Sequence, residues 1–594
     1  MRRITVPVTL QVQGPILTKS SSMGALGLDA VMARRAFEEP ATGDVKTRYY
    51  FPGGLVKGLL REAWQELATV DPTLLNCASE WLGDASLPDS QDEPARGRLM
   101  FDDFADIQTE PEAGHPVRYR IEIDEDRGAA DAAKLQMMES PYASGQVVQF
   151  QGQVRFLVSD GEKEGKIDAL RAALARGLMW IEAAGGMRTS GFGQLLDVKV
   201  GPETAATLDS KPSLCGSEWD LHLHFRDPVI LSKRRIADNF FESGEIIPGG
   251  ALKGAVAEML AREGESFQEL RDQLHAIRFS HAFPAKTESA RPRSWPLSLL
   301  VFAGEPVDVV RRKESYAGKT ETGLKAGSFD IDWKDEDRRK VHAAYGWPDL
   351  KWELRVRTAV DSTLRKAGDG QLFAWQVLQP YGLEWIARVD ASRVSKPARE
   401  QLEGVLRFGL EPIGKTKALA TTILTAAAQQ TVTAAQEYVV TLQTPALLID
   451  PGRRLAPNGA LGSAREEDLE GEFQDVWQEI SNGSLRLVNY FQRCVLAGGK
   501  YLQNRFLGRN RRYKPYSLSV EGSTFLLEPV DGKEREACAR LAEWLRTGLP
   551  LAEGVRKFYG IPDDPAVQWK HCPYIPENGY GEIAVNEPSP YKEQ

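Results

Sequence analysis

The sequence predicts an α+β protein made of related modules in tandem. Three strand-like segments open in the same way, with TLQVQGPILT around Pro15, HLHFRDPVILS around Pro228 and VVTLQTPALLID around Pro445. Each alternates apolar and polar residues, which indicates a half-buried strand, and then reaches a proline, which suits a strand end, an edge or a bulge. The near-constant spacing of the three copies is that of a small domain.

The first two copies continue with the same glycine turn and helix. PGGLVKGLLREAW begins at Pro52 and PGGALKGAVAEML begins at Pro248, whereas the third copy lacks this turn. Each module has a later helix with apolar residues at helical spacing, namely IDALRAALARGLMWIEAA, REQLEGVLRFGL and ACARLAEWLRTGL. The strand–helix–strand order predicts ferredoxin-like modules of the split βαβ type.

Two modules also carry a matching segment between strand-like flanks. RIEIDEDRGAADAAKLQMMES starts at Arg120, and RTAVDSTLRKAGDGQLFAWQV starts at Arg357. A polar excursion between two strands predicts a protruding β-hairpin. We therefore expect three domains, at 1–206 with a hairpin near 118–155, at 207–432 and at 433–594.

Composition limits the class of protein. The 594 residues are 42% hydrophobic and 26% charged, as in ordinary globular proteins, and the net charge of −9 leaves room for local basic grooves. No run of 18 apolar residues suggests a membrane span, and the N-terminus lacks the apolar core of a signal peptide. Five scattered cysteines without a C-x-x-C pair fit free thiols in a reducing compartment. We expect a cytoplasmic protein.

The glycine turn resembles a phosphate cradle only in part. PGGLVKG lacks the order of a Walker loop and has no hydroxyl after its lysine. One interpretation is a helix start in which proline and glycine supply geometry alone. We favour a second interpretation, in which backbone N–H groups at the helix N-terminus face a polymeric phosphate backbone and Lys57 and Lys253 add charge.

Other segments have residues suited to RNA binding. The loop GGMRTSGFG lets backbone approach a ligand closely, and RFLGRNRRYKPY interleaves cations with aromatic rings that stack bases, although a solvated charged hairpin is the alternative. The expected contacts are Gly185, Gly186, Arg188, Gly191 and Gly193 in the loop, Lys415 and Lys417 in its counterpart IGKTKALATTI, and Arg505, Arg509, Arg511, Arg512 and Lys514 in the basic patch.

These features together resemble the RAMP (repeat-associated mysterious protein) superfamily of CRISPR effector subunits. The resemblance covers nearly the whole chain. The first module is similar to a Cas-seven-type backbone subunit of a type III system, and the other two to a two-lobed Cas-five-like subunit of type III-D. It implies a natural fusion of RRM-like modules. It also implies crRNA, target RNA, further backbone subunits and the large polymerase-like subunit as partners, with no membrane.

The resemblance also implies roles for individual residues. The hairpin would act as a thumb that flips out a nucleotide pair, with Met137 and Met138 as wedge residues or, alternatively, as core. The family's Gly-aliphatic-Asp loop matches MGALGLDAVMARR and places a catalytic aspartate at Asp29. That carboxylate would accept the 2′-hydroxyl proton of RNA or hold Mg²⁺ or another divalent metal, while Arg34 and Arg35 neutralise developing charge.

Alternatives stay open at this point. Asp29 also fits a turn cap in a chain that only binds crRNA as a scaffold. A stand-alone guide-processing endoribonuclease of the same superfamily is a further alternative. The second module has no Gly-aliphatic-Asp before its glycine turn, which favours a guide-end-binding role for the second and third modules.

Overall fold

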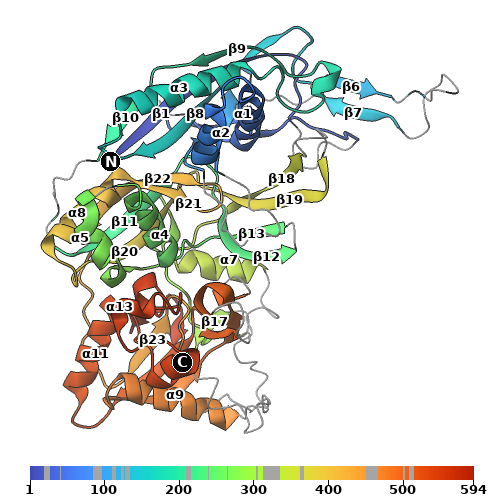
Figure 1. Cartoon of the computed structure of the whole chain (residues 1–594). Helices are drawn as coiled ribbons and strands as arrows, with labels where there is room; N and C mark the ends of the chain where they lie inside the picture. The colour runs from blue at the N-terminus through green and yellow to red at the C-terminus, as the bar shows by residue number, and fades with distance from the viewer. Residues whose placement is uncertain are drawn as a thin grey trace.

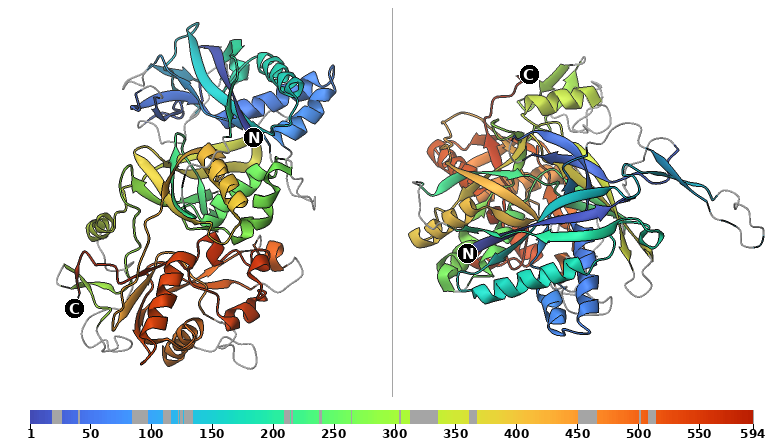
Figure 2. Two further views of the ribbon diagram at one scale, coloured as in Figure 1. Left: turned by 90° about the vertical axis from the view of Figure 1, so that its left-hand side faces the viewer. Right: turned by 90° about the horizontal axis from the view of Figure 1, so that it is seen from above.

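The computed structural model describes the chain up to Glu593, except for 19–26, 40–41, 84–96, 110–115, 122, 124–125, 127–133, 209–213, 215, 238–239, 264, 303–304, 312–334, 361–366, 450–465, 500–501 and 508–513. The three modules follow one another along a stack, with the first module at the top of Figure 1 and the third at the bottom. Figure 2 shows the same order from the side.

The first module is a twisted antiparallel sheet covered by two helices. Strand β1 largely alternates buried and partly buried residues, in line with the half-buried strand that the sequence predicts, and its Val6, Val8 and Leu10 pack into the core with Trp64 of α1. The Trp64 indole N–H donates to the carbonyl of Ala173, which ties α1 to α3. The elements are β1 (Arg2–Gln13), β2 (Arg34–Glu38), β3 (Val45–Phe51), α1 (Gly53–Leu67), α2 (Thr73–Cys77), β4 (Met100–Phe101), β5 (Phe104–Asp106), β6 (Val117–Arg120), β7 (Gln136–Glu139), β8 (Val147–Val158), α3 (Glu164–Met179), β9 (Gln194–Val200) and β10 (Thr204–Thr207).

The second module repeats this arrangement and contributes strands to two further sheets. Its core packs Leu221 and Leu223 of β11 against Val256 of α4 and Val405 of α8. The elements are β11 (Glu218–Phe225), β12 (Leu231–Ala237), β13 (Phe240–Gly244), α4 (Gly249–Leu260), α5 (Gln268–Gln273), β14 (Arg278–Phe279), β15 (Phe283–Lys286), β16 (Leu299–Phe302), β17 (Glu305–Asp308), α7 (Asp335–Ala344), β18 (Lys351–Val360), β19 (Ala367–Gln379), β20 (Leu383–Asp390), α8 (Lys396–Phe408), β21 (Leu410–Ile413) and β22 (Ala418–Ala426).

The third module keeps the core and has few additions. Its sheet packs Val440 and Phe525 against Trp477 of α9 and Leu541 of α11. The elements are β23 (Tyr438–Leu442), α9 (Glu466–Ile480), β24 (Leu485–Phe491), β25 (Cys494–Ala497), β26 (Tyr516–Ser519), β27 (Thr524–Pro529), α11 (Glu534–Thr547), α12 (Glu553–Tyr559), α13 (Pro565–Gln568), β28 (Ile583–Val585) and β29 (Lys592–Glu593).

Strand order shows that the three modules share one topology. Reading across each core sheet, the neighbours are β9–β1–β8–β5, β22–β11–β20–β14 and β28–β23–β27–β24. In chain order within a module this is 4-1-3-2, with one helix after the first strand and one after the third, which is the ferredoxin-like arrangement. The predicted α+β fold of tandem ferredoxin-like modules is therefore confirmed, while the domain limits near 206 and 432 stay predictions.

Two hairpins project from the same side of the stack in Figure 1, one built from β6 and β7 and the other from β18 and β19. The predicted end of the first hairpin near residue 155 is wrong, because Val147–Val158 forms β8 and pairs with β1 at the centre of the sheet. In the described part of the chain, no helix is long and apolar enough to cross a membrane.

Candidate functional site

Asp29 lies at the root of the first hairpin, with its side chain exposed. Its Oδ2 accepts the N–H of Met137 at 2.7 Å, and its own N–H donates to the Met137 carbonyl at 2.8 Å. Ala30 continues the contact through an isolated bridge to Met138. The carboxylate is thus held in one place beside β7, and its Oδ1 makes no recorded hydrogen bond to the described residues, so it can accept a proton or bind a cation.

A second carboxylate, Glu139, also holds the root of the hairpin in place, and no sequence motif indicated it. Glu139 is buried; its Oε2 accepts the N–H of Met32 at 2.9 Å, and its Oε1 lies 3.4 Å from Nη1 of Arg34. Burial and the Glu139 charge raise the pKa of Tyr49, whose hydroxyl lies 3.5 Å from Oε1. No sequence signal marks Glu139, because its partners come from two segments that lie about 90–110 residues earlier in the chain.

The two arginines that follow Asp29 have different environments. Successive residues of a strand face opposite sides, so Arg34 stays near the hairpin root, with its side chain 35% exposed, while Arg35 is buried. Arg35 pairs with Asp103 at 2.8 Å and with Asp227 of the second module at 2.6 Å. The expectation that Arg35 neutralises charge on RNA is therefore wrong, because its guanidinium is already used between modules.

The two proposed wedge methionines are not equivalent either. Met138 is 4% exposed and packs at the root, so its role as a wedge is wrong, whereas Met137 is half-buried beside Asp29. Among the described residues of the hairpin, the exposed apolar side chains are instead Tyr119, Ile121, Ile123 and Leu135. Their alternation with polar residues in VRYRIEI is a sequence signal that points to these residues.

The glycine loop of the first module (residues 185–193) rests on the segment after Pro15. The N–H of Gly186 donates to the Leu17 carbonyl at 2.7 Å, and the N–H of Gly193 donates to the Pro15 carbonyl at 2.8 Å. A Cβ on Gly193 would meet the Ala184 carbonyl oxygen at 1.9 Å, so this glycine permits a close approach of backbone.

The remaining residues of this loop differ in exposure. Gly185 has φ near +100° and its Cβ would meet Leu17, whereas Gly191 is exposed with open space around it. Arg188 lies 3.6 Å from Glu62 of α1. Contact with RNA stays a prediction for all of them, and the exposed positions Gly186 and Gly191 fit it best.

The counterpart loop of the second module rests on its own module in the same way. The Lys415 N–H donates to the Ile230 carbonyl at 3.1 Å, and Ile230 follows Pro228 as Leu17 follows Pro15. The Lys415 ammonium lies 3.5 Å from the centre of the Phe241 ring. Lys417 reaches into the first module, where its Nζ donates to the Gly97 carbonyl at 3.1 Å.

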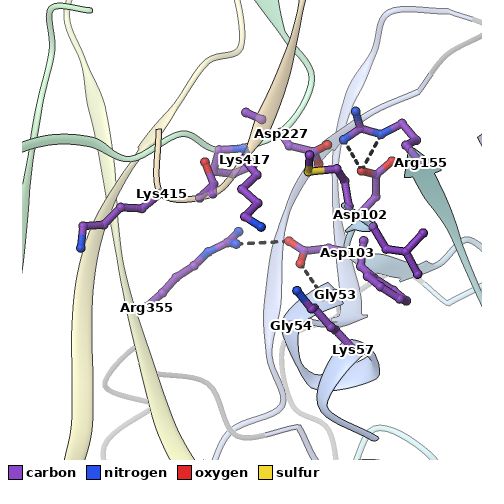
Figure 3. A pocket seen from close by; sticks show the side chains of 16 residues that line it. Gly53, Gly54, Lys57, Asp102, Asp103, Arg155, Asp227, Arg355, Lys415 and Lys417 are labelled. Atoms are coloured by element: carbon purple, nitrogen blue, oxygen red, sulfur yellow. Dashed lines mark hydrogen bonds and ion pairs between the residues drawn. The ribbon is translucent and has the colours of Figure 1, made fainter. Parts of the chain in front are cut away.

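A pocket of about 190 Å³ lies where this loop meets the glycine turn at Pro52, and we call this contact the first junction (Figure 3). Lys57 lines the pocket, and burial together with the charges of Lys417 and Arg61 lowers its pKa to about 8. Among the described residues, Lys57 has no recorded hydrogen bond or ion pair.

The carboxylates of the same pocket are already paired. Asp102 accepts a hydrogen bond from Arg155 at 2.7 Å, and Asp227 forms an ion pair with Arg35. The third carboxylate of the pocket, Asp103, forms an ion pair with Arg355 at 3.2 Å and accepts the N–H of Gly53 at 2.9 Å. Each acid thus has an arginine partner, and Lys57 at the start of a helix is left to attract an anion such as a phosphate.

Lys253 occupies a different environment at the second junction, where the glycine turn at Pro248 meets residues 576–581 of the third module. A Cβ on Gly249 would meet the Phe279 oxygen at 1.9 Å and the Asn578 oxygen at 2.7 Å. Burial lowers the pKa of Lys253 to about 7, and its Nζ lies 3.5 Å from the His275 carbonyl. The expected contact of Lys253 with a polymeric phosphate backbone is wrong, because the third module closes over this turn.

The basic patch is only partly described. Arg505 and Lys514 are exposed, and Lys514 donates to the Phe558 carbonyl at 3.0 Å. Tyr516, which the sequence placed among base-stacking rings, is buried against Tyr559 and is not accessible to bases. Arg509, Arg511 and Arg512 lie outside the described residues, so their role in RNA binding stays a prediction.

A metal ion at Asp29 would take most of its ligands from the substrate and from water. Among the described residues, no group of three or more His, Cys, Asp or Glu side chains could hold a metal ion. One exposed carboxylate with a free oxygen suits Mg²⁺, which commonly takes one or two carboxylates and fills its other positions with phosphates and water. The residues present fit that arrangement and do not form a protein-only cage.

Tandem ferredoxin-like modules with glycine loops define the structural class of this chain. Within it, residues 9–196, which span most of the first module, match the model of the RAMP superfamily. No protein of curated function matches the sequence.

Solved structures give weaker likenesses. A chain of the type III-B Cmr-beta complex bound to cognate target RNA and AMPPnP is 11% identical, with a TM-score of 0.29, over 55% of this chain and 93% of that one. A chain of a type IV-B CRISPR complex is 16% identical, with a TM-score of 0.19, over 36% of this chain and 93% of that one. With TM-scores this low, no property of either complex is transferred to this chain.

Proposed function

We propose that the chain is a subunit of a type III CRISPR RNA-guided effector complex that binds crRNA and cleaves complementary target RNA at the first module. The observation that carries this proposal is the position of Asp29, an exposed carboxylate fixed by Met137 at the root of a protruding hairpin in a RAMP module. On this proposal the second and third modules hold an end of the guide, and the complex acts in the cytoplasm of a prokaryote.

Cleavage of RNA by its own 2′-hydroxyl requires mainly that the reacting groups are held in the right geometry. The apolar side chains Tyr119 and Ile121 on the hairpin suit insertion into a guide–target duplex, which frees one target nucleotide from its stack. The 2′-hydroxyl then attacks the adjacent phosphorus in line, Asp29 accepts the hydroxyl proton, and the departing 5′-oxygen takes a proton from water. Arg34, at the same root, offsets charge on the phosphate. A divalent cation bound by Asp29 and the phosphate would supply further charge stabilisation.

Guide binding has a separate basis in the pocket of the first junction. Lys57 there lies in the first turns of α1 and has no recorded ion pair among the described residues, and Lys417 lines the same pocket. These groups suit a phosphate of the guide backbone, which a protein contacts without reading sequence. The exposed glycine loop of the first module offers a further such contact.

The decisive experiment compares Asp29→Asn with the wild-type chain in an assembled complex loaded with crRNA. Asparagine keeps an oxygen that accepts the Met137 N–H but is not a base at neutral pH. We expect target cleavage opposite the first module to fall by about 10²–10⁴-fold, as for loss of a general base, with target binding changed less than about twofold.

The control is Asp44→Asn, an exposed aspartate in the turn between β2 and β3, which should cleave as wild type does. Undiminished cleavage by Asp29→Asn would leave the chain as a crRNA-binding scaffold without catalysis. Cleavage of repeat RNA by the purified chain alone would instead identify a guide-processing nuclease.

A further inference from the structure

The pocket of the first junction contains buried polar groups that the protein itself leaves without partners. Arg355 is 7% exposed, and its guanidinium lies 3.2 Å from Asp103 through Nη1 and 3.2 Å from Glu353 through Nε. Its Nη2 has no hydrogen-bond partner among the described residues, and neither has the buried hydroxyl oxygen of Thr416, which lines the same pocket. Because a buried donor is costly to leave unpaired, these two groups favour a bound acceptor.

The same pocket concentrates positive charge. Its five cationic side chains are Lys57, Arg155, Arg355, Lys415 and Lys417, and its acids are the three carboxylates described above, each with an arginine partner. Lys57 has no recorded hydrogen bond or ion pair to the described residues, and Figure 3 shows its side chain converging with those of Lys417 and Arg355. The lining therefore has two positive charges in excess, which a small dianion would balance.

The size of the pocket and its donors fit a phosphate group. Its volume of about 190 Å³ lies below the roughly 300–1,000 Å³ of pockets for drug-sized ligands. The 15-residue helix α1 begins at its wall with Gly53 and Gly54, so the positive end of the helix dipole adds to the ammonium and guanidinium groups. Lys57 belongs to the first module, and Arg355 and Thr416 belong to the second, so an anion between them touches both modules.

We propose that this pocket binds a free phosphate dianion, as inorganic phosphate or a phosphomonoester, which clamps the first and second modules together while the chain carries no RNA. Lys57 and the start of α1 hold the anion from the first module, and Nη2 of Arg355 and Oγ1 of Thr416 hold it from the second. The inference goes beyond the proposed function and rests on it in one respect. Guide RNA, whose phosphate would use the same lysine, must displace the free anion.

The clamp has a physical basis in the two lysines that face each other across the junction. The charge of Lys417 contributes, after burial, to the lowered pKa of Lys57, which means that the two ammonium groups repel each other. A dianion between them replaces this repulsion with attraction to both modules. Since no strand pairing spans the first junction among the described residues, the bound anion would add appreciably to its stability.

The test follows thermal unfolding of the full-length, RNA-free chain as inorganic phosphate replaces chloride at constant ionic strength. We expect a saturable rise in melting temperature, because a ligand that binds only the folded state stabilises it. Sulfate, which is also a dianion, should act in the same way. Dimethyl phosphate has one charge and two blocked oxygens, as an internal RNA phosphate has, and should bind about tenfold more weakly or worse.

Two substitutions each remove one contact to the anion. Lys57→Met should weaken phosphate binding about tenfold or more, and Thr416→Val should weaken it by a fewfold. Thr416→Val replaces an unpartnered hydroxyl with a methyl group of similar size, so without phosphate it should unfold at the wild-type temperature or above. This variant therefore separates loss of the anion from loss of the fold.

The matched control is Lys253→Met, the equivalent change at the second junction, which should bind phosphate as wild type does. General stabilisation by phosphate that is excluded from the protein surface is the same in all variants, so it cancels in these comparisons. Hydrogen exchange gives a second readout, since residues 414–418 should become protected by phosphate in the wild-type chain and not in Lys57→Met.

Adenosine monophosphate distinguishes the two sources of the anion. Tighter binding of this nucleotide than of inorganic phosphate would identify a phosphomonoester as the ligand, and equal or weaker binding would identify free phosphate. Three results would overturn the inference: no saturable rise in melting temperature, an equal rise in Lys57→Met, or binding of dimethyl phosphate as tight as that of phosphate.

The proposed function fails or stands separately. Phosphate should compete with a short single-stranded RNA more strongly than chloride does at the same ionic strength. Absence of this competition would contradict the guide contact proposed for the pocket, while a saturable rise in melting temperature that depends on Lys57 would keep the clamp. Undiminished target cleavage by Asp29→Asn would likewise leave the clamp unaffected.

Discussion

At both junctions a PGG-x-x-KG turn of one module meets a loop of the next module, and the two loops differ. The loop of the second module, with Lys415 and Lys417, leaves a pocket of about 190 Å³ over the first glycine turn. The loop of the third module places Asn578 and Glu577 over the second turn, where the Asn578 backbone approaches Gly249 closely. One motif therefore produces an open cationic pocket or a closed contact, and the loop that faces it decides which.

The PGG-x-x-KG motif can therefore serve in packing or in anion binding, and its sequence alone does not distinguish the two roles. At the second junction the turn acts as a packing element, and its half-buried lysine loses enough hydration to lower its pKa. At the first junction the lysine stands beside other cations at a pocket, with the nearby carboxylates paired to arginines. Binding of an anion is thus expected only at the first junction.

The largest effect is expected from filling the closed junction. Gly249→Val should lower the free energy of unfolding by about 3 kcal/mol or more, because its Cβ would overlap the oxygens of Phe279 and Asn578 and the backbone must move. Urea unfolding followed by tryptophan fluorescence measures this change.

Gly254→Ala in the same helix is the matched control, since a Cβ there meets nothing within 4 Å. It should leave stability unchanged or raise it by up to about 1 kcal/mol, as alanine for glycine does within a helix. Equal losses for the two variants would mean that the second junction is not closed.

A smaller effect is expected from removing the buried charge at that junction. Lys253→Met should raise the free energy of unfolding by about 1–2 kcal/mol near pH 6.5, because an apolar side chain of similar length avoids burying an ammonium group. Burial lowers the pKa of Lys253 to about 7, so between pH 7 and 10.5 the unfolded chain binds more protons than the folded one.

The contribution of Lys253 to wild-type stability therefore becomes more favourable as pH rises through that window. The gain from Lys253→Met should accordingly be larger at pH 6.5 than at pH 9.5, measured by denaturation at both values. A gain independent of pH would show that the ammonium is not buried.

The smallest change is expected from the open junction. Lys57→Met should weaken binding of a short single-stranded RNA by a fewfold and reduce the slope of log affinity against log salt by about 0.7, the value for one phosphate contact on a single strand. Because the pKa of Lys57 is lowered to about 8, the same affinity of the wild-type chain should fall as pH rises from 7 to 9.

Lys253→Met provides the comparison for this measurement as well, since the closed junction should leave RNA binding and its salt dependence unchanged. An effect of Lys253→Met as large as that of Lys57→Met would remove the distinction between the two junctions.

Local patterns were sufficient to predict the fold of this chain. The three strand openings, the helical spacing and the hairpin flanks each specify an element within a few residues, and together they define the repeated ferredoxin-like order. The hairpin limit at 155 failed because β8 continues the same alternating pattern into the core.

The candidate site was harder to predict because its contacts join distant segments. Asp29 was found through a resemblance, and its anchor on Met137 depends on how the hairpin folds back. Arg35 and Met138 are buried and Lys253 is half-buried, although all three carry side chains suited to RNA, and no local pattern shows that a neighbouring module or core covers them.

The last strand of the chain has a mechanical consequence. β29 pairs in parallel with β17 of the second module, and a buried cluster there mixes Phe283 and Leu299 with Phe491 and Val520 of the third. Among the described residues, no strand pairing spans the first junction, which is held by side chains and the linker. We therefore expect any bending of the stack to concentrate between the first and second modules, while the second and third, which share a strand pairing and a core, move together.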